Sequence, residues 1–266
     1  MEFNKDSIIK YYTEKYDEDF RFKKDKAHLA EFLVTKEYLL KFIKKDSKIL
    51  ELGAGGGAYT KLFADMGCNI TATDLVPKHV EILKEKFKDY SNVKVDVANA
   101  LNLENFKEKY DIILCMGPLY HISNKKERLT VIENVYDRLN ENGYAFFAFC
   151  LQDNAIVHYV FGNGASAKKE LSEIKYDAKT ATVVENTNSN FVLNKITDIN
   201  DLFKNYNEVF RFAQDGCSSI ISNYLNEMND EDYGLFVEYL IATATRPDLI
   251  GYSGHIISVI KKWLII

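Results

Sequence analysis

The chain has 266 residues, of which 47% are hydrophobic and 27% are charged, and its formal net charge is −5. This length and composition predict a globular protein with one large domain or two small ones. Lysine and arginine are spread along the chain without a basic block, so we expect no nucleic-acid partner.

The chain also shows no pattern typical of a membrane protein or a metal site. Its first residues mix acidic and basic side chains, unlike a signal peptide, and apolar runs such as Tyr144–Leu151 are too short to span a bilayer. No group of cysteine, histidine or carboxylate residues has the spacing of metal ligands. We therefore expect a cytoplasmic protein without a metal or a membrane partner, either a monomer or a homodimer.

The first part of the chain is predicted to be helical. From residue 5 to about residue 45, apolar side chains repeat at helical spacing on either side of a charged, aromatic connection, Tyr16–Asp25. Arg21 lies in this connection. Its guanidinium could pair with the carboxylate of a bound ligand, or with an acid in the same segment.

The segment Lys48–Thr60, KILELGAGGGAYT, predicts a strand, a glycine-rich turn and the start of a helix. Such a turn lets a ligand approach the main chain and the unpaired N–H groups of the helix. The spacing from Gly53 through Gly55 to Ala58 formally fits a dinucleotide fingerprint. Glu51 precedes these glycines, however, and a carboxylate there would repel a pyrophosphate. It suits S-adenosylmethionine (SAM), which carries an ammonium and a sulfonium.

The second and third strands are expected at Cys68–Asp74 and Val93–Val97. Asp74 ends its strand where doubly wound folds place an acid that binds ribose hydroxyls, although it could simply cap the next helix. The turn after the third strand contains Asn99. This residue either contacts the ligand or is an ordinary turn former.

The almost wholly apolar stretch Tyr110–Met116 predicts a buried strand of a parallel sheet, and the loop Gly117–His121 follows at the ligand-binding edge. Tyr120 offers a ring for stacking or for facing a sulfonium. His121 suits a general base or a group that positions the acceptor. The alternative is that the His121 ring nitrogens bond backbone groups and cap the next helix.

The helix Lys125–Leu139, a turn at Asn142-Gly143 and the strand Tyr144–Leu151 complete a five-stranded parallel core. The elements expected beyond it are a short helix Ala155–Phe161 ending at Gly162–Gly164, a helix Asp198–Asn205, a strand Val209–Gln214, two helices within 218–243 and a strand within Gly251–Lys261. Helices between the last two strands predict an inserted cap. It either shapes an acceptor pocket or extends the core.

Together these features resemble class I SAM-dependent methyltransferases over nearly the whole chain. More narrowly, they resemble a bacterial small-molecule subgroup with a GPLYH motif after strand four. The resemblance rests on Tyr16–Phe22, Glu51–Gly57, Asp74–Pro77, Gly117–Ile122 and Pro247–His255.

The resemblance implies a doubly wound, Rossmann-like α/β sheet of seven strands. A helical N-terminal lid would span residues 1–45 and a SAM-binding core residues 46–151. Residues 152–266 would complete the sheet with helical cap insertions. The cofactor-binding residues it implies are Arg21, Glu51, Gly53, Ala54, Gly55, Asp74, Leu75, Asn99, Ala100 and Met116. Asn99 and Ala100 would contact adenine, and Asn99 departs from the commoner Asp.

The expected reaction is methyl transfer from SAM to a small-molecule acceptor by in-line displacement, with S-adenosylhomocysteine (SAH) as the product. Tyr120 and His121 would border the acceptor, with His121 as the first candidate base and Tyr120 as the second. Enzymes that methylate nucleobase amines carry an acid or amide where this chain has Gly117, which argues against DNA or RNA as the acceptor. The alternatives are an NAD(P)-dependent oxidoreductase and a non-catalytic SAM-binding protein.

Overall fold

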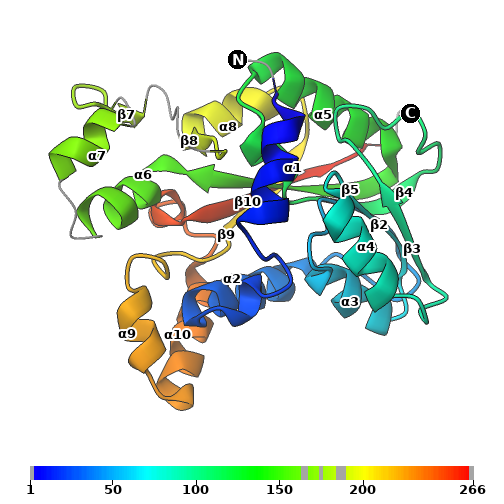
Figure 1. Ribbon diagram of the computed structural model, residues 1–266, viewed down its shortest axis with the longest axis horizontal. Coiled ribbons are helices and arrows are strands. Elements are labelled where there is room, and N and C mark those ends of the chain that lie inside the picture. Colours follow the sequence, from blue (N-terminus) through cyan, green and yellow to red (C-terminus); the bar gives the residue numbers. More distant parts are fainter. Residues whose placement is uncertain (1–2, 163–166, 174–175, 184–189, 264–266) are drawn as a thin grey trace.

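The computed structural model describes residues 3–162, 167–173, 176–183 and 190–263, which form a large mixed sheet with helices on both faces (Figure 1). Seven strands run in the order β3-β2-β1-β4-β5-β10-β9, and β8 pairs with the end of β5. The strands are β1 Lys48–Leu52, β2 Asn69–Asp74, β3 Val93–Val97, β4 Tyr110–Cys115, β5 Leu139–Leu151, β8 Leu193–Asn194, β9 Glu208–Ala213 and β10 His255–Lys261. Strands β1 to β5 are parallel, whereas β10 is antiparallel to β5 and β9. The predicted doubly wound sheet is confirmed, with β8 as a short addition.

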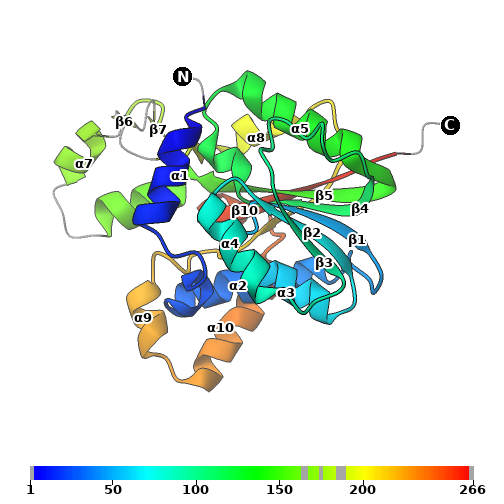
Figure 2. The same cartoon turned by 45° about the vertical axis from the view of Figure 1, so that its right-hand side comes forward.

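Two helical layers cover the sheet. In Figure 1, α2, α3, α4 and α10 lie below the sheet, and α5 and α8 lie above it. The view in Figure 2 shows the same two layers. The helices of these layers are α2 Lys26–Leu39, α3 Ala58–Asp65, α4 Pro77–Lys86, α5 Lys125–Arg138, α8 Ile196–Phe203 and α10 Asp230–Thr243. Helix α1, Lys5–Glu14, leads into the connection to α2, and its Ile8 and Tyr12 pack against Val76 at the start of α4.

The centre of the sheet is buried on both faces, as its apolar sequence predicts. In β4, Ile112, Ile113 and Leu114 are at most 2% exposed, and Phe146 and Phe147 of β5 are fully buried. Apolar side chains on both faces are what a parallel strand between two helical layers requires. The carboxyl ends of these strands therefore share one edge, where ligands bind in doubly wound folds.

Strand β5 begins earlier than expected, at Leu139, directly after α5. The turn predicted at Asn142-Gly143 is an irregularity within this strand. Asn142 has a φ of 60°, and the register of β5 against β4 shifts near this point.

The segment after β5 is helical, as predicted, but its type changes along its length. Helix α6, Gln152–Ala155, continues as a π-helix, η3, at Ile156–Phe161. Gly162 is its C-cap, whereas Asn163 and Gly164 of the predicted turn lie outside the described residues. Helix α7 (Ala167–Glu173) and the hairpin of β6 (Tyr176–Asp177) and β7 (Thr182–Val183) follow at the left of Figure 1.

Two helices, α9 (Ser222–Glu227) and α10, lie between β9 and β10 and pack against α2. The Tyr38 hydroxyl donates to the Ile241 carbonyl, and the Tyr233 hydroxyl donates to the Lys26 carbonyl, both at 2.7 Å. Buried residues of α2, of the sheet and of α10 belong to one hydrophobic core. Helix α10 therefore extends that core, which is one of the two roles considered for the insertion.

Within the described part of the chain, no helix combines the length and the apolar character needed to cross a membrane.

Candidate functional site

The carboxyl ends of β1, β2 and β4 open into a cavity beneath the connection between α1 and α2. The residues predicted to bind the cofactor or to act in catalysis all line this first cavity. They are Arg21, Glu51, Gly53, Ala54, Gly55, Asp74, Leu75, Asn99, Ala100, Met116, Tyr120 and His121. The fold thus brings distant parts of the sequence to the edge where doubly wound sheets bind ligands.

The glycine turn between β1 and α3 has the backbone conformation that its sequence predicts. Gly53, Gly55 and Gly57 have φ values of 79°, 54° and 75°, which favour glycine. The N–H groups of Gly53 and Ala54 both donate to the Thr73 carbonyl at 2.9 Å, which ties the turn to β2. Along this turn the cavity is therefore lined by main-chain atoms.

Glu51 lies at the base of the first cavity and is only 4% exposed. The Thr60 hydroxyl donates to its carboxylate at 2.5 Å. Burial, opposed in part by the hydrogen bond from Thr60 and supported by nearby Asp74, raises the pKa of Glu51 to about 7. A cation beside Glu51 would favour its charged form.

Asp74 joins β2 to the glycine turn. Its carboxylate accepts hydrogen bonds from the N–H groups of Gly55 and Val76, both at 2.8 Å. Val76 is the N-cap residue of α4, and this helix has no side-chain cap hydrogen bond, so Asp74 bonds the residue before the helix without capping it. Carboxylate oxygens accept more than one bond, so Asp74 can still bind ribose hydroxyls. The buried His79 Nδ1 lies 3.3 Å from this carboxylate and has no hydrogen-bond partner among the described residues.

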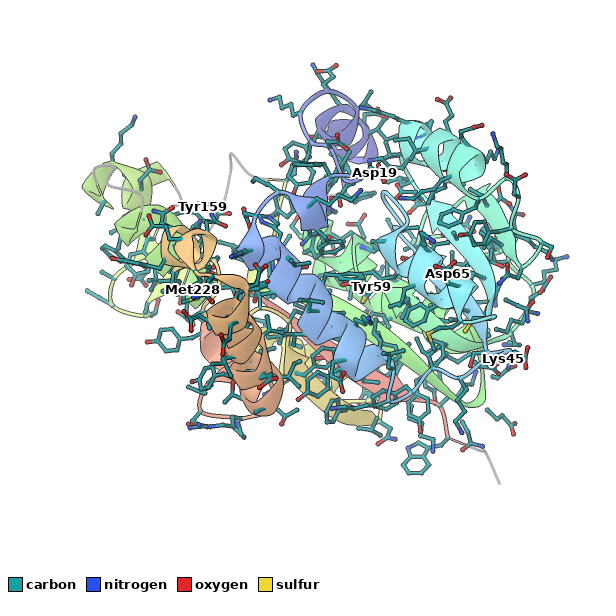
Figure 3. All side chains as sticks on the ribbon, turned by 90° about the horizontal axis from the view of Figure 1, so that it is seen from below. Asp19, Lys45, Tyr59, Asp65, Tyr159 and Met228 are labelled. Carbon is teal, nitrogen blue, oxygen red and sulfur yellow. The ribbon has the colours of Figure 1, made fainter. Side chains whose placement is uncertain are left out.

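The connection between α1 and α2 packs directly onto the glycine turn. A Cβ added to Gly56 would lie 2.4 Å from the Asp19 Cα. The Lys86 Nζ donates to Asp19 Oδ1 at 2.7 Å and to the Gly56 carbonyl at 2.6 Å, which links the two segments. Figure 3 labels Asp19 on this connection, between α1 and α2.

Arg21 pairs with an acid outside its own segment. Its Nη2 donates to both carboxylate oxygens of Glu31 in α2, at 2.8 and 3.0 Å. The Arg21 Nε and the Tyr59 hydroxyl are buried and have no hydrogen-bond partner in the described part of the chain. Both residues line the first cavity, and Figure 3 shows Tyr59 beside α2. Unpaired buried donors are rare and costly, so these two atoms suit an anionic group of a ligand.

Asn99 adopts the turn geometry that was one of its two predicted roles. Its Oδ1 accepts from the Leu101 N–H at 3.0 Å. The Asn134 side chain donates to the Ala100 carbonyl at 3.0 Å, which fixes the turn from α5. Asn99 and Ala100 nevertheless line the first cavity.

Both ring nitrogens of His121 already have partners. Nδ1 lies 2.8 Å from the Asn190 carbonyl, and Nε2 lies 3.0 Å from the Tyr12 hydroxyl. If Nδ1 carries the proton, Nε2 accepts from Tyr12. Burial lowers the pKa of His121 to about 4, so the ring is neutral at pH 7. This arrangement suits a residue that positions its neighbours better than it suits a free general base.

A second cavity lies next to the first. The first contains about 1120 Å³ of empty space and the second about 1950 Å³, including space open to solvent. Residues from the α1–α2 connection, β5, α6, η3 and the start of α9 line the second cavity. The two cavities share a wall made of Tyr12, Glu18, Arg21, Glu31 and Tyr120.

Asp215 and His255 form a pair at the edge of the second cavity. The His255 Nδ1 lies 2.8 Å from Asp215 Oδ2, and the Ser253 hydroxyl donates to Oδ1 at 2.6 Å. Burial opposes a charge on His255, but Glu31 and Asp215 outweigh it and raise the pKa of His255 well above its usual range. Ligand atoms of Glu31, Asp215 and His255 lie within 4.8 Å of one another. Because Glu31 pairs with Arg21 and Asp215 with His255, we interpret this group as an ion-pair cluster.

Several further residues line these cavities and were not predicted to bind a ligand, chiefly Glu18, Glu31, Tyr59, Asp215 and His255. Tyr59 follows the glycines directly, and Glu18 and His255 lie within strings that carried the family resemblance. Glu31, Asp215 and His255 meet partners elsewhere in the sequence, so no local spacing could assign these three a role.

Residues 49–143 match a family described as a methyltransferase domain. The chain is 33% identical over 108 residues to the ribosomal RNA small subunit methyltransferase A of Syntrophus aciditrophicus, an alignment that covers 40% of this chain and 34% of that protein. It is 28% identical over 109 residues to the ubiquinone biosynthesis O-methyltransferase of Histophilus somni, covering 39% of this chain and 44% of that protein. The chain therefore matches less than half the length of these relatives.

Among solved structures, the N-methyltransferase NodS from Bradyrhizobium japonicum, in complex with SAH, has a similar fold. The superposition covers 97% of this chain and 98% of NodS, with a TM-score of 0.58 and 14% sequence identity. At this identity the likeness shows the fold alone. The chain therefore shares the fold of this methyltransferase structure, and residues 49–143 match the methyltransferase-domain family. The narrower subgroup with the GPLYH motif stays a prediction.

Proposed function

We propose that this protein is a SAM-dependent methyltransferase that transfers a methyl group to a small-molecule acceptor. One observation carries the proposal: every residue predicted to bind the cofactor lines one cavity, and a second, larger cavity shares a wall with it. SAM supplies a methyl group that its sulfonium has already activated. The protein then needs chiefly to hold the acceptor in line with that methyl group, and such positioning can account for much of the catalysis.

The charges of the first cavity support SAM over a dinucleotide. Glu51 and Asp74 are both buried there, and two carboxylates would repel a pyrophosphate. The unpaired Arg21 Nε and Tyr59 hydroxyl would hold the methionine carboxylate, which deepens the role predicted for Arg21. We assign Asp74 to the ribose, and Asn99 with Ala100 to the adenine.

The acceptor is assigned to the second cavity. Tyr120 lies in the shared wall and would face both the methyl group and the acceptor. His121 would act through Tyr12, whose hydroxyl it holds at 3.0 Å. We therefore keep His121 in the site as a positioning residue.

A nucleic-acid acceptor is the second candidate, because one relative is a ribosomal RNA methyltransferase. The net charge of −5 and the dispersed lysines and arginines disfavour it, since phosphate contacts dominate nucleic-acid affinity. A cavity partly covered by α6, η3 and α9 also suits a small molecule better than a polymer.

Calorimetry separates the candidate functions. We expect SAH to bind the full chain with a dissociation constant in the micromolar range, and NADH and NADPH to give no heat above dilution. Incubation of the protein with methyl-labelled SAM and a metabolite extract should then label a small molecule. Binding of NADH without SAH would support the oxidoreductase. Binding of SAH with no labelled product would support a non-catalytic SAM-binding protein, and label in RNA would support the nucleic-acid acceptor.

A further inference from the structure

The wall between the two cavities contains one carboxylate without a partner. Arg21 and Glu31 neutralise each other in this wall through two hydrogen bonds of 2.8 and 3.0 Å. The Glu18 side chain forms no hydrogen bond or ion pair with any residue that the structure describes, although it lines both cavities. It packs over the glycine turn, with its Oε2 3.4 Å from where a Cβ on Gly55 would lie.

The surroundings of Glu18 disfavour the charged form of its carboxyl group. Burial raises the pKa of its carboxyl above the usual range, while Arg21 and His79 lower it, and Glu31 and Asp74 raise it further. A cation that entered the wall would offset this cost by pairing with the carboxylate.

Aromatic rings surround the same region. Tyr11 stacks on Tyr16 at a centroid distance of 6.1 Å, and Tyr12 meets Tyr16 edge to face at 6.0 Å. The Tyr120 ring stacks on Phe191 at 5.7 Å. All five rings line the second cavity. Ring faces attract cations, and groups of rings around a substituted ammonium are a common means of recognising it.

The other charged groups of the second cavity do not replace Glu18 as the partner of a cation. Asp25 pairs with His28, and Asp215 pairs with His255, both at 2.7–2.8 Å. Lys24 is exposed and Glu170 is partly exposed at this cavity. Among the carboxylates that line the second cavity, Glu18 is therefore the one that also lines the first cavity and can bind a cation without breaking an existing ion pair.

We propose that the second cavity binds the methyl acceptor as an amine, held by the Glu18 carboxylate and by the rings of Tyr12, Tyr16 and Tyr120. This inference rests on the proposed methyltransferase function and names its acceptor class. The bound ammonium gives one proton to Glu18, and its nitrogen lone pair forms the new N–CH₃ bond. The S–CH₃ bond breaks with its electron pair left on sulfur, so SAH leaves uncharged and the product carries the positive charge as a methylated ammonium.

The test uses the full chain saturated with SAH and a minimal pair of probes. Choline carries a trimethylammonium group, and 3,3-dimethylbutan-1-ol has the same shape without the charge. We expect choline to bind at least about fivefold more tightly than the alcohol, a ratio typical of a cation on aromatic rings. In Glu18→Gln this preference should fall, because the rings then attract the cation without the carboxylate. In Glu14→Gln, an exposed change in α1 outside both cavities, it should be unchanged.

Three results would overturn the inference. The first is equal binding of the two probes, which would show that the cavity binds them by apolar contact and does not recognise the charge. The second is absence of choline binding to the SAH-loaded protein. The third is a Glu18→Gln variant that weakens SAH and leaves choline binding unchanged, because Glu18 would then serve the cofactor. Failure of SAH itself to bind would instead count against the proposed function, so the two failures are distinguishable.

Discussion

Glu51 connects the sequence pattern to the choice of ligand, because its carboxylate lies at the base of the glycine turn. Burial raises its pKa to about 7, so the group is partly protonated near neutral pH in the free protein. The ammonium and sulfonium of SAM, and the ammonium of SAH, favour the ionised form. Binding should therefore release a proton and strengthen as the pH rises through about 7.

We accordingly expect the dissociation constant of SAH, measured by calorimetry, to fall between about pH 6 and pH 8. In Glu51→Gln most of this dependence should disappear, because the amide does not titrate. Glu18 lines the same cavity and its pKa is also raised, so a small residual slope is expected. An equal slope in the variant and the wild type would assign the effect to other groups and remove Glu51 from its role.

The raised pKa of Glu51 also makes the stability of the free protein depend on pH. A rise in pH that strengthens SAH binding should lower this stability. Between its ordinary pKa and about 7, Glu51 holds a proton in the folded state that the unfolded chain has released. Stability therefore falls as the pH rises through this range. Thermal unfolding from about pH 5 to pH 7 should show a smaller loss for Glu51→Gln than for the wild type. Parallel curves for the two proteins would contradict the raised pKa.

Asp74 has two tasks, since it ties the glycine turn to β2 and is assigned to the ribose. We expect Asp74→Ala to weaken SAH binding by about 1–3 kcal/mol, the cost of leaving polar groups unpaired in a buried site. Asp65→Ala is the matched control, because that residue forms an exposed ion pair with Lys61. An unchanged dissociation constant in Asp74→Ala would refute the ribose assignment.

At the scale of elements, the contact of the α1–α2 connection with the glycine turn is the feature most open to test. Gly56 lacks a positive φ, yet an added Cβ would lie 2.4 Å from the Asp19 Cα. Relieving such a clash costs about 1–3 kcal/mol and has to move the connection away from the turn. Gly56→Ala should therefore weaken SAH binding and speed amide hydrogen exchange over residues 15–24.

The control for this substitution is Gly234→Ala, which carries its own expected outcome. Gly234 lies inside α10, and a Cβ added there meets no atom within 4 Å. The helix propensity of alanine should then stabilise the protein by about 0.5–1 kcal/mol, measured by denaturant unfolding, with SAH binding unchanged. Exchange over residues 15–24 that rises equally in both variants would show that the effect of Gly56→Ala is not local.

Element boundaries show where sequence reasoning succeeds and where it fails. Strand β3, in which valines alternate with Lys94 and Asp96, was predicted to the residue, and the apolar strand β4 was predicted to within one. The two-residue strand β8 was not predicted, because its pairing with β5 depends on tertiary contact alone. The π-helix η3 was expected as an ordinary helix, since its sequence has no feature that distinguishes the two.

On the scale of the whole molecule, the sequence was sufficient for the fold and for the location of the first cavity. The glycine turn, Asp74 and the loop at Tyr120 each follow a predicted strand, and a parallel sheet brings strand ends to one edge. The second cavity could not be predicted from the positions of the strand ends. Glu31 and Asp215 meet their partners Arg21 and His255 across 10 and 40 residues of sequence. The packing of α2 against Arg21–Lys23 and the pairing of β10 with β9 explain these meetings.

The ligand of the first cavity decides between the candidate functions, and a crystal grown with SAH and NADH together tests its identity most directly. We predict electron density for SAH alone, with its ribose at Asp74, its ammonium on the side of Glu51 and its carboxylate near Arg21 and Tyr59. Density for the nicotinamide dinucleotide across the glycine turn, without SAH, would contradict the account.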